Sequence, residues 1–472
     1  MVAGTFFHLY SDEIQQLHDL SLPEGQIGYT LPAVALLHAL REQLNAAVGG
    51  LPQSALTHRD IRLPKISNKA HAVIGMRRAG KTCFLRQLQD ASRASVAAER
   101  AIFIGFDDDR LAGIDAGQLD ELLEEYYRRF PQFRRRERVW WYLDEIQLVP
   151  GWDRFVRRVM DTEQIDFVVS GSSARLLSRE IHSSLRGRAV ATVVSPFSFR
   201  EYLRHRGEEP ESSARRFTAA ERSAAEKRLR EFLVVGGFPE AQGLDDTTRI
   251  ALLQGYVDTV LFRDVVERYG VTQVAALRWI TRHALRSPCS SFSVNRLYND
   301  LRSQGHAIGK ATVHDLLGHL IDAFLLAAVP VATESERRRN TNPRKLYPVD
   351  PGLIQAFDSG GRSNTGHALE LVVFNELHRR GADVAYVKTK GDLEVDFLAR
   401  YPGGREELIQ VCVDPSEPAT LGRELAALDA AGIEHPRAVK QLIVTEASAV
   451  GRIRHPHAEP VTALQWLLSS SQ

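Results

Sequence analysis

Eight consecutive residues have the types and spacing that a phosphate-binding loop requires. Four residues separate two glycines, and a lysine and a threonine follow the second one: Gly75-Met76-Arg77-Arg78-Ala79-Gly80-Lys81-Thr82. Glycine permits backbone conformations that bring several N–H groups around an anionic phosphate chain. Lys81 supplies a point charge for the β- and γ-phosphates of a nucleotide, and the Thr82 hydroxyl can bind Mg²⁺.

The sequence around this motif has the order strand, loop, helix. An apolar run at residues 72–74 precedes it, and the helical pattern that follows contains Phe84, Leu85 and Leu88. The N-terminus of that helix adds free N–H groups and the positive end of a dipole. This context favours a nucleotide site over an ordinary glycine-rich turn. We expect the following residues to bind the nucleotide: Gly75, Arg78, Ala79, Gly80, Lys81, Thr82 and Cys83.

A second group of candidate residues follows a later apolar strand. Residues 139–143 run directly into Asp144 and Glu145. Adjacent acids are common on protein surfaces, but after a phosphate-binding loop they supply the carboxylates that ATP hydrolysis needs. Asp144 would hold Mg²⁺ through its water shell, and Glu145 would polarise the attacking water. The two motifs together predict a site for ATP and Mg²⁺, with Thr82 and Asp144 as metal ligands. Its predicted catalytic residues are Lys81 and Glu145.

The strand patterns near these motifs predict how the sheet is arranged. An apolar pattern at residues 101–106 comes between the two motifs. It implies a sheet in which a strand separates the phosphate-loop strand from the Asp-Glu strand, as in ATPases that use a catalytic glutamate. The next strand, at residues 166–170, ends in Gly171, Ser172 and Ser173. A small polar residue there lies beside the γ-phosphate in this architecture, so we expect Ser172 or Ser173 to orient the water. A plain glycine-serine turn is the alternative.

Two arginines before the expected fifth strand are candidates for catalysis between subunits. Arg186 and Arg188 precede the strand at residues 191–194. Arginines on a loop near the carboxyl edge of the sheet can reach the nucleotide of a neighbouring subunit and neutralise the charge of the transition state. We prefer Arg188, and a surface salt bridge is the alternative. The prediction implies a homo-oligomer.

One helical pattern precedes the phosphate-loop motif, at residues 31–47. Its leucines share one face of the helix: Leu36, Leu37, Leu40 and Leu44. We expect this helix to pack on the nucleotide domain. A contact between subunits is the alternative.

The middle of the chain is predicted to be helical and then to form a winged helix. Helical patterns cover residues 216–233 and 250–269, and the second contains Arg263 and Asp264, which we expect to form a buried or interfacial pair. Residues 270–350 have three helical patterns followed by two strands. The tip between these strands carries four arginines: Arg337, Arg338, Arg339 and Arg344. We expect this wing to contact the phosphate backbone of DNA. A rigid lid or a protein contact is the alternative.

The C-terminal stretch is predicted to have the order helix, strand, strand, helix, strand. Glu370 lies in the first helix, and Asp396 lies near the start of a strand. This is the skeleton of a restriction-endonuclease type of nuclease, in which the strand acid and an acid on the next strand bind Mg²⁺ and a lysine activates water. Here the next strand carries Gln410 and Cys412 instead. Because an amide binds Mg²⁺ poorly and a thiol cannot replace an ammonium group, we expect the geometry of such a site without its activity.

The composition argues against several other classes of protein. The formal net charge is +1, so any nucleic-acid or membrane contact has to come from a local patch. The cysteines, Cys83, Cys289 and Cys412, are far apart in the sequence, which argues against disulfides and zinc sites. We find no signal-peptide pattern and no apolar run long enough to span a membrane. We therefore expect a cytoplasmic protein without a membrane contact.

Taken in order, these motifs resemble those of a known family. It comprises bacterial and archaeal AAA-type ATPases that carry a C-terminal domain of unknown function with an endonuclease-like core. The resemblance covers residues 60–450 and rests on these segments: Gly75–Thr82, Leu143–Gln147, Ser170–Ser173, Leu185–Arg188, Pro196–Phe199, Gly236–Pro239, Arg263-Asp264, Leu346–Asp350 and Glu394–Asp396. It implies ATP binding at Lys81, Thr82 and Asp144, with hydrolysis through Glu145, but it names no physiological substrate.

The expected fold class is α/β. A P-loop AAA-type ATPase domain with a parallel sheet is followed by a winged helix and an endonuclease-like α/β domain. The expected domains are an N-terminal helical segment (1–60), the ATPase core (61–205), a helical lid or connector (206–275), the winged helix (276–350) and a catalytically degenerate endonuclease-like domain (351–472).

Three functional hypotheses follow from these observations. The leading one is Mg²⁺-dependent ATP hydrolysis by an oligomer that is coupled to nucleic-acid binding or remodelling. The second is a nucleotide-gated switch that binds a protein partner and hydrolyses ATP slowly. The third is an ATP-driven, Mg²⁺-dependent nuclease, against which Gln410 and Cys412 argue.

Overall fold

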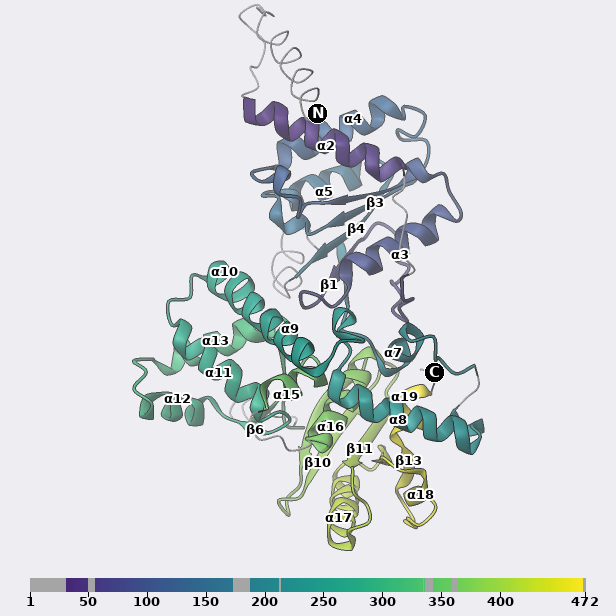
Figure 1. Ribbon diagram of the computed structural model, residues 1–472, viewed down its shortest axis with the longest axis vertical. Helices are drawn as coiled ribbons and strands as arrows, with labels where there is room; N and C mark the ends of the chain where they lie inside the picture. The colour runs from purple at the N-terminus through teal and green to yellow at the C-terminus, as the bar shows by residue number, and fades with distance from the viewer. Residues whose placement is uncertain are drawn as a thin grey trace, which may run out of the picture.

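The computed structural model describes residues 31–49, 56–172, 187–211, 214–333, 335, 343–358 and 364–469. These residues form three sheets with helices around them. Figure 1 shows the first sheet and its helices at one end of the long axis, and the other two sheets side by side at the other end. Within the described ranges, every helix is too short or too polar to span a bilayer.

The first sheet has five parallel strands in the order β2-β3-β4-β1-β5. Its strands are β1 (Ala70–Ile74), β2 (Ala101–Gly105), β3 (Val139–Asp144), β4 (Ile165–Gly171) and β5 (Ala189–Val193). β4 lies between β1, which leads into the phosphate-binding loop, and β3, which ends in Asp144. The predicted separation of the two motif strands is therefore confirmed. β2, which comes between them in the sequence, lies at the edge of the sheet.

Helices cover both faces of this sheet, which is why its strands are apolar on both sides. They are α2 (Leu31–Gly49), α3 (Lys81–Arg93), α4 (Ala116–Arg129) and α5 (Trp152–Thr162). Phe84 and Leu85 of α3 pack on one face. α4 and α5 cover the opposite face, and α2 packs against α4 and β2. Leu40 and Leu44 of α2 are buried in this core, as expected for a helix that packs on the nucleotide domain.

Helices connect the first sheet to the rest of the molecule. They are α7 (Phe199–His205), α8 (Ala219–Val235), α9 (Asp246–Thr259), the π-helical stretch η7 (Val260–Val266) and α10 (Glu267–Tyr269). The last three follow one another without a break, so that the π-helical turns lie inside one long helix. Such π-helical turns are rare and are found frequently at functional sites.

A small antiparallel sheet with three helices follows. The helices are α11 (Val274–Arg286), α12 (Val294–Ser303) and α13 (Lys310–Asp322). The strands are β6 (Ser291–Phe292), β7 (Leu326–Val329) and β8 (Arg344–Pro348), in the order β6-β8-β7. β6 is a short strand that the sequence patterns did not indicate.

The second five-stranded sheet has the order β13-β12-β11-β10-β9. Its strands are β9 (Asp383–Lys388), β10 (Glu394–Arg400), β11 (Glu406–Cys412), β12 (Val439–Val444) and β13 (Glu459–Thr462). β9, β10 and β11 are antiparallel, whereas β11, β12 and β13 are parallel. The predicted order of elements was incomplete, because it lacked β9 and β13.

Further helices surround this sheet and join it to the rest. They are α15 (Pro351–Phe357), α16 (Thr365–Arg379), α17 (Pro418–Glu434), α18 (Ala447–Val450) and α19 (Ala463–Leu468). Short 3-10 turns complete the described chain: η1 (Ala98–Arg100), η2 (Asp109–Leu111), η3 (Ile146–Leu148), η5 (Ala214–Arg216) and η6 (Pro239–Ala241).

A buried carboxylate holds the turn after α8 against the start of α15. Asp350 accepts hydrogen bonds from the backbone N–H groups of Gly237 at 2.7 Å and Gly352 at 2.9 Å. A Cβ at Gly236 would lie only 1.9 Å from Asp350 Oδ1, so glycine is required there. Two motifs that are far apart in the sequence therefore meet at this point.

Replacing Asp350 with alanine tests this contact. The change removes both acceptors and leaves two buried N–H groups without partners, each of which costs about 1–3 kcal/mol. We expect the free energy of unfolding to fall by about 2–6 kcal/mol in urea titrations followed by circular dichroism. Asp315→Ala is the matched control, because that side chain is 67% exposed, and we expect it to change the stability by less than about 0.5 kcal/mol. Equal effects of the two changes would contradict the assignment.

Candidate nucleotide-binding site

The loop after β1 has a backbone that depends on its glycines. Gly75 has φ +147° and Gly80 has φ +96°. A Cβ at Gly75 would lie 2.1 Å from the carbonyl oxygen of Val194, so no other residue fits there. Arg78 also has a positive φ, of 66°. The motif thus forms a tight loop that leads into α3, where Cys83 is exposed in the first turn.

Lys81 lies inside this loop. The residue is 5% exposed, and its Nζ donates hydrogen bonds to the carbonyl oxygens of Gly75 and Met76, both at 3.1 Å. Burial lowers the pKa of Lys81, and the carboxylates of Glu145 and Asp144 oppose this effect. The ammonium group is therefore held within the loop and under the influence of two acids.

Asp144, at the end of β3, bonds both to the first turn of α3 and to the neighbouring strand β4. Its Oδ2 accepts a hydrogen bond from the Thr82 hydroxyl at 2.7 Å, and its Oδ1 accepts one from the Ser170 hydroxyl. Burial raises the pKa of Asp144, and both hydrogen bonds lower it. Sequence analysis missed Ser170, although its place at the end of a strand beside β3 was a usable signal.

The oxygen atoms of Thr82 and Asp144 fit a magnesium ion that is shared with a nucleotide. Mg²⁺ commonly takes one or two protein oxygens and completes its octahedron with water and substrate phosphates. The two oxygens already lie 2.7 Å apart on adjacent elements. In the part of the chain that the structure describes, no group of three or more His, Cys, Asp or Glu residues is placed to hold a metal without such help.

Glu145 has an unusual backbone for a glutamate. Its φ is 52° and its ψ is 37°, in the left-handed region. The backbone N–H donates to Ser170 Oγ at 2.9 Å, and the carboxylate accepts a hydrogen bond from the Gln147 side chain. Left-handed conformations of residues other than glycine cost free energy and are concentrated at active sites and ligand clamps. The turn directs Glu145 away from the line of β3.

Ser172 is buried at the end of β4 and binds a residue that sequence analysis interpreted differently. Its hydroxyl donates to Asp264 Oδ1 at 3.1 Å. Asp264 lies in the π-helical stretch and also accepts a hydrogen bond from Arg77 of the loop, at 2.8 Å. The expectation of burial is confirmed for Asp264 and wrong for Arg263, which is exposed and binds Glu267, and the interfacial alternative stays a prediction.

Arg188 lies at the opposite edge of the sheet from the phosphate-binding loop. Its carbonyl oxygen accepts a hydrogen bond from the N–H of Ala70, the first residue of β1, at 2.8 Å. Its side chain forms an ion pair with Asp161 at the end of α5. The expected position near the carboxyl edge is therefore wrong, and its action on a neighbour's nucleotide stays a prediction. Arg186 and Ser173 lie outside the described residues.

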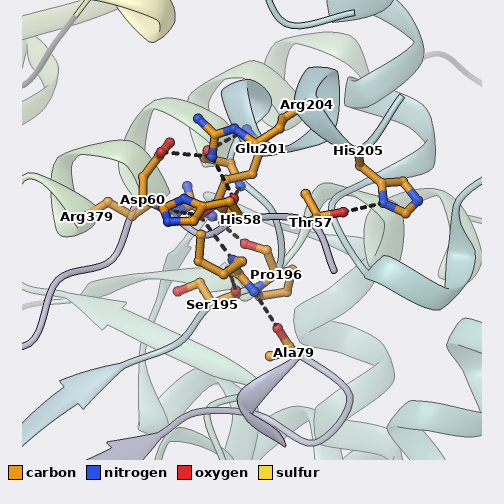
Figure 2. Close-up of polar contacts among 12 residues, drawn as sticks. Thr57, His58, Asp60, Ala79, Ser195, Pro196, Glu201, Arg204, His205 and Arg379 are labelled. Carbon is orange, nitrogen blue, oxygen red and sulfur yellow. Dashed lines mark hydrogen bonds and ion pairs between the residues drawn. The ribbon is translucent and has the colours of Figure 1, made fainter. Parts of the chain in front are cut away.

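The segment that precedes β1, residues 57–60, supports the phosphate-binding loop through hydrogen bonds. Arg59 is buried, and its guanidinium donates to the carbonyl oxygen of Ala79 at 3.0 Å and to that of Ser195. It also forms an ion pair with Glu201 at 3.0 Å and lies over the ring of Phe197. Figure 2 shows how Ala79, Ser195 and Glu201 converge on this segment. An isolated arginine outside any motif offered no signal in the sequence.

The same segment is held between α7 and the loop. The Arg204 side chain donates to the carbonyl oxygen of His58 at 2.6 Å and pairs with Asp60 at 2.9 Å. Thr57 shares a hydrogen bond with His205 at 2.7 Å (Figure 2). Arg379 of α16 donates to the carbonyl oxygen of Pro196 beside this cluster, at 2.8 Å. The segment therefore connects the phosphate-binding loop with α7, and α16 contacts the residues next to this connection.

A second charged cluster contains the acids that were predicted in the C-terminal region. Glu370 and Asp396 lie together, and Lys345 of β8 reaches both, at 3.2 and 3.4 Å, as well as Glu394 at 2.8 Å. Burial alone lowers the pKa of Lys345, but the three carboxylates outweigh it and raise the pKa. Burial and the neighbouring Glu370 raise the pKa of Asp396.

The other two predicted residues of this region lie on β11. Gln410 is opposite Asp396, and its amide oxygen accepts a hydrogen bond from the Asp396 N–H at 3.1 Å. Its amide nitrogen donates to Glu424. Cys412 is buried in an apolar cluster. Lys345 was not foreseen as a partner of these residues, because it belongs to the strand of a different sheet.

The predicted wing is described only in part. Arg344 is the first residue of β8. Arg337, Arg338 and Arg339 lie outside the described residues.

The sheet order and the site define the class of this protein. A loop of this sequence after β1, an Asp-Glu pair after β3 and a strand between them are the features of a P-loop ATPase domain of the AAA type. Residues 67–203 match the family model of the AAA domain (AAA_14). Residues 226–364 match a domain of unknown function (DUF8612).

The chain belongs to the same family as the uncharacterized protein MJ1544 of Methanocaldococcus jannaschii. The two are 33% identical over 384 residues, which cover 80% of this chain and 82% of the relative. An uncharacterized protein of Haemophilus influenzae is 28% identical over 333 residues, which cover 70% of this chain and 78% of that protein. Among solved structures, the Walker-type ATPase PABY2304 of Pyrococcus abyssi is 14% identical, with a TM-score of 0.41, over 68% of this chain and 94% of the other.

Replacing Lys345 with methionine tests the buried charge cluster. Because the change leaves buried carboxylates without a counter-ion, we expect the free energy of unfolding at pH 8 to fall by about 3–5 kcal/mol. In the variant the pKa of Asp396, already raised by burial, rises further above its unfolded value. The folded state then binds more protons than the unfolded state. The loss in free energy of unfolding, relative to the unmodified protein, should therefore grow as the pH rises from 5 to 8.

The control for this prediction is Lys388→Met. Lys388 is 52% exposed and pairs only with the exposed Asp392 among the contacts described for it. We expect the Lys388→Met change to lower the free energy of unfolding by less than about 1 kcal/mol, and we expect this loss to stay the same over the same pH range. If the Lys345→Met change lowers the free energy of unfolding only slightly, or by the same amount at every pH, then the charges of Lys345 and the carboxylates do not depend on one another.

Proposed function

We propose that this protein hydrolyses ATP in a Mg²⁺-dependent reaction at the carboxyl edge of the first sheet. One observation carries the proposal: the phosphate-binding loop and the Asp-Glu pair meet, with Thr82 donating to Asp144 at 2.7 Å. Lys81 and the left-handed turn at Glu145 belong to the same site. The match to the AAA domain supports this assignment.

In the proposed reaction each residue has a separate role. Lys81 binds the β- and γ-phosphates and stabilises the charge that develops as the bond to the leaving ADP breaks. Glu145 polarises the attacking water, and Ser172 helps to orient it. Mg²⁺ held by Thr82 and Asp144 would neutralise charge on the phosphates. The remaining nucleotide contacts come from Gly75, Arg78, Ala79, Gly80 and Cys83.

We further propose a cytoplasmic homo-oligomer whose hydrolysis is coupled to nucleic acid. Arg188 of one copy would act on the nucleotide of another. The order of α11 to α13 and β6 to β8 supports a winged helix, whose wing would carry Arg344 to a DNA backbone. The arginines 337–339 belong to the same proposed contact.

A second function, the nucleotide-gated switch, is favoured by one particular observation. Arg59 bonds directly to the loop carbonyl of Ala79 and to Glu201 of α7. A loop that changes with its nucleotide would therefore move the segment that holds α7. In this version a protein partner, in place of DNA, responds to the bound nucleotide, and hydrolysis acts as a timer.

We propose that the C-terminal region has the skeleton of an endonuclease-like domain without its activity. The helix and strand order from α16 to β12 supports the skeleton. The ammonium group of Lys345 lies between Glu370 and Asp396, where a nuclease would need a divalent cation. Gln410 and Cys412 offer neither a second carboxylate nor a lysine. The third hypothesis, an active nuclease, is therefore not retained.

Replacing Glu145 with glutamine tests the proposed hydrolysis. The amide cannot polarise water as a carboxylate does, so we expect steady-state turnover of ATP to fall by about 10²-fold or more, with unchanged affinity for ATP. Lys81→Ala should weaken ATP binding itself. Glu459→Gln, an exposed residue of β13, is the matched control and should keep full turnover. Full activity in the Glu145→Gln protein would rule out the assignment.

The coupling to nucleic acid is tested by measuring ATP turnover with duplex DNA, with single-stranded DNA and without DNA. We expect DNA to raise turnover several-fold in the full chain and to do so less at high salt, because phosphate contacts release counter-ions. A combined Arg337, Arg338, Arg339 and Arg344 to alanine variant should lose the stimulation and keep its basal turnover. If DNA does not change the turnover, and a protein partner binds only in the ATP state, the nucleotide-gated switch would be favoured.

A further inference from the structure

Three successive residues of the phosphate-binding loop contact the helical region that follows the first sheet. The Met76 side chain is 1% exposed and lies in the apolar core of that region, with Phe238 and Leu253. Arg77 bonds to Asp264 at 2.8 Å. Arg78 pairs with Glu240 at 3.1 Å. The loop is therefore attached both to its own sheet and to the helices from η6 to α10.

Asp264 is the centre of this attachment. Its side chain is fully buried (0% exposed), and one oxygen accepts from Arg77 Nε. The other accepts from the Ser172 hydroxyl at 3.1 Å and lies 3.7 Å from Arg268. The carboxylate thus forms an anion bound by groups from the phosphate-binding loop and from the end of β4.

These two groups, a guanidinium and a hydroxyl, are hydrogen-bond donors of the kind that a phosphate binds. Ser172 stands at the strand end beside the expected γ-phosphate, and a hydroxyl has only one proton to donate. The Coulomb interactions of Arg77 with Glu145, and of Lys81 with Asp264, place all four groups in one electrostatic neighbourhood. A bound ADP, which lacks the terminal phosphate, makes no demand on the Ser172 proton.

We propose that Asp264 is a specificity-determining residue that competes with the γ-phosphate for Arg77 and Ser172. ATP has to displace this carboxylate, whereas ADP leaves it in place, so the π-helical stretch is released from the loop only in the ATP state. The proposal rests on the proposed function and adds to it a discrimination between the two nucleotides. It also identifies η7 as the element that responds to the terminal phosphate.

Asp264→Asn is the direct test, because asparagine has the same shape and keeps an acceptor for Ser172 but has no charge for Arg77. Dissociation constants are measured by calorimetry for a slowly hydrolysed ATP analogue and for ADP, with Mg²⁺. We expect the variant to bind the ATP analogue about tenfold more tightly, which corresponds to about 1.4 kcal/mol, with little change for ADP. Asp258→Asn, an exposed residue of α9 on the same long helix, should change neither constant.

Equal changes in both constants, or weaker binding of the ATP analogue, would overturn the proposal and leave Asp264 as a structural ion-pair partner. Hydrogen exchange on the unmodified protein provides a second test that does not depend on the variant folding. We expect faster exchange in residues 260–266 with the ATP analogue than with ADP, and equal exchange would also overturn the proposal. Absence of Lys81-dependent binding of either nucleotide would instead overturn the proposed function itself.

Discussion

The candidate site depends on the carboxylate of Asp144, because it joins elements that the sheet order keeps apart. β4 separates β3 from β1, and Asp144 bridges this gap by accepting hydrogen bonds from Ser170 of β4 and from Thr82 after the loop. Burial raises the pKa of Asp144, and the two hydroxyl donors stabilise its anion. The same bonds fix the end of β3, from which Glu145 turns away with a positive φ.

Contacts between distant residues mark the limit of what could be predicted from the sequence. The loop, the Asp-Glu pair and the separation of their strands follow from short motifs, and all three are present. Arg77 contacts Asp264, which is 187 residues away in the sequence, and Lys345 contacts Asp396, which is 51 residues away. No sequence pattern indicates either contact. Arg188 was misplaced for another reason: a residue that precedes a parallel strand lies at the amino edge, whereas the loop after β1 lies at the carboxyl edge.

Buried ion pairs at the junctions between regions are a common feature of this molecule. Arg59 with Glu201 joins the loop to α7, and Lys345 with Glu370 joins the small sheet to α16. Such pairs add little net stability, because both charges lose their hydration, but an unpaired member is costly. Each pair therefore penalises alternative arrangements of the two regions that it connects. The geometry between regions is set by charge at a few points and by apolar packing around them.

The contacts of residues 57–60 with the phosphate-binding loop and α7 also limit the order in which the nascent chain can form its tertiary contacts on the ribosome. The N–H of Asp60 donates to the side chain of Glu201, which is synthesised 141 residues later. Next to it, Arg200 donates to the carbonyl oxygen of Leu468, a further 268 residues along. The segment therefore gains these partners soon after β5, the last strand of the first sheet to be synthesised, whereas α7 gains its hydrogen bond to α19 only much later. During that interval, the side of α7 that will contact α19 is a surface on which a chaperone can act.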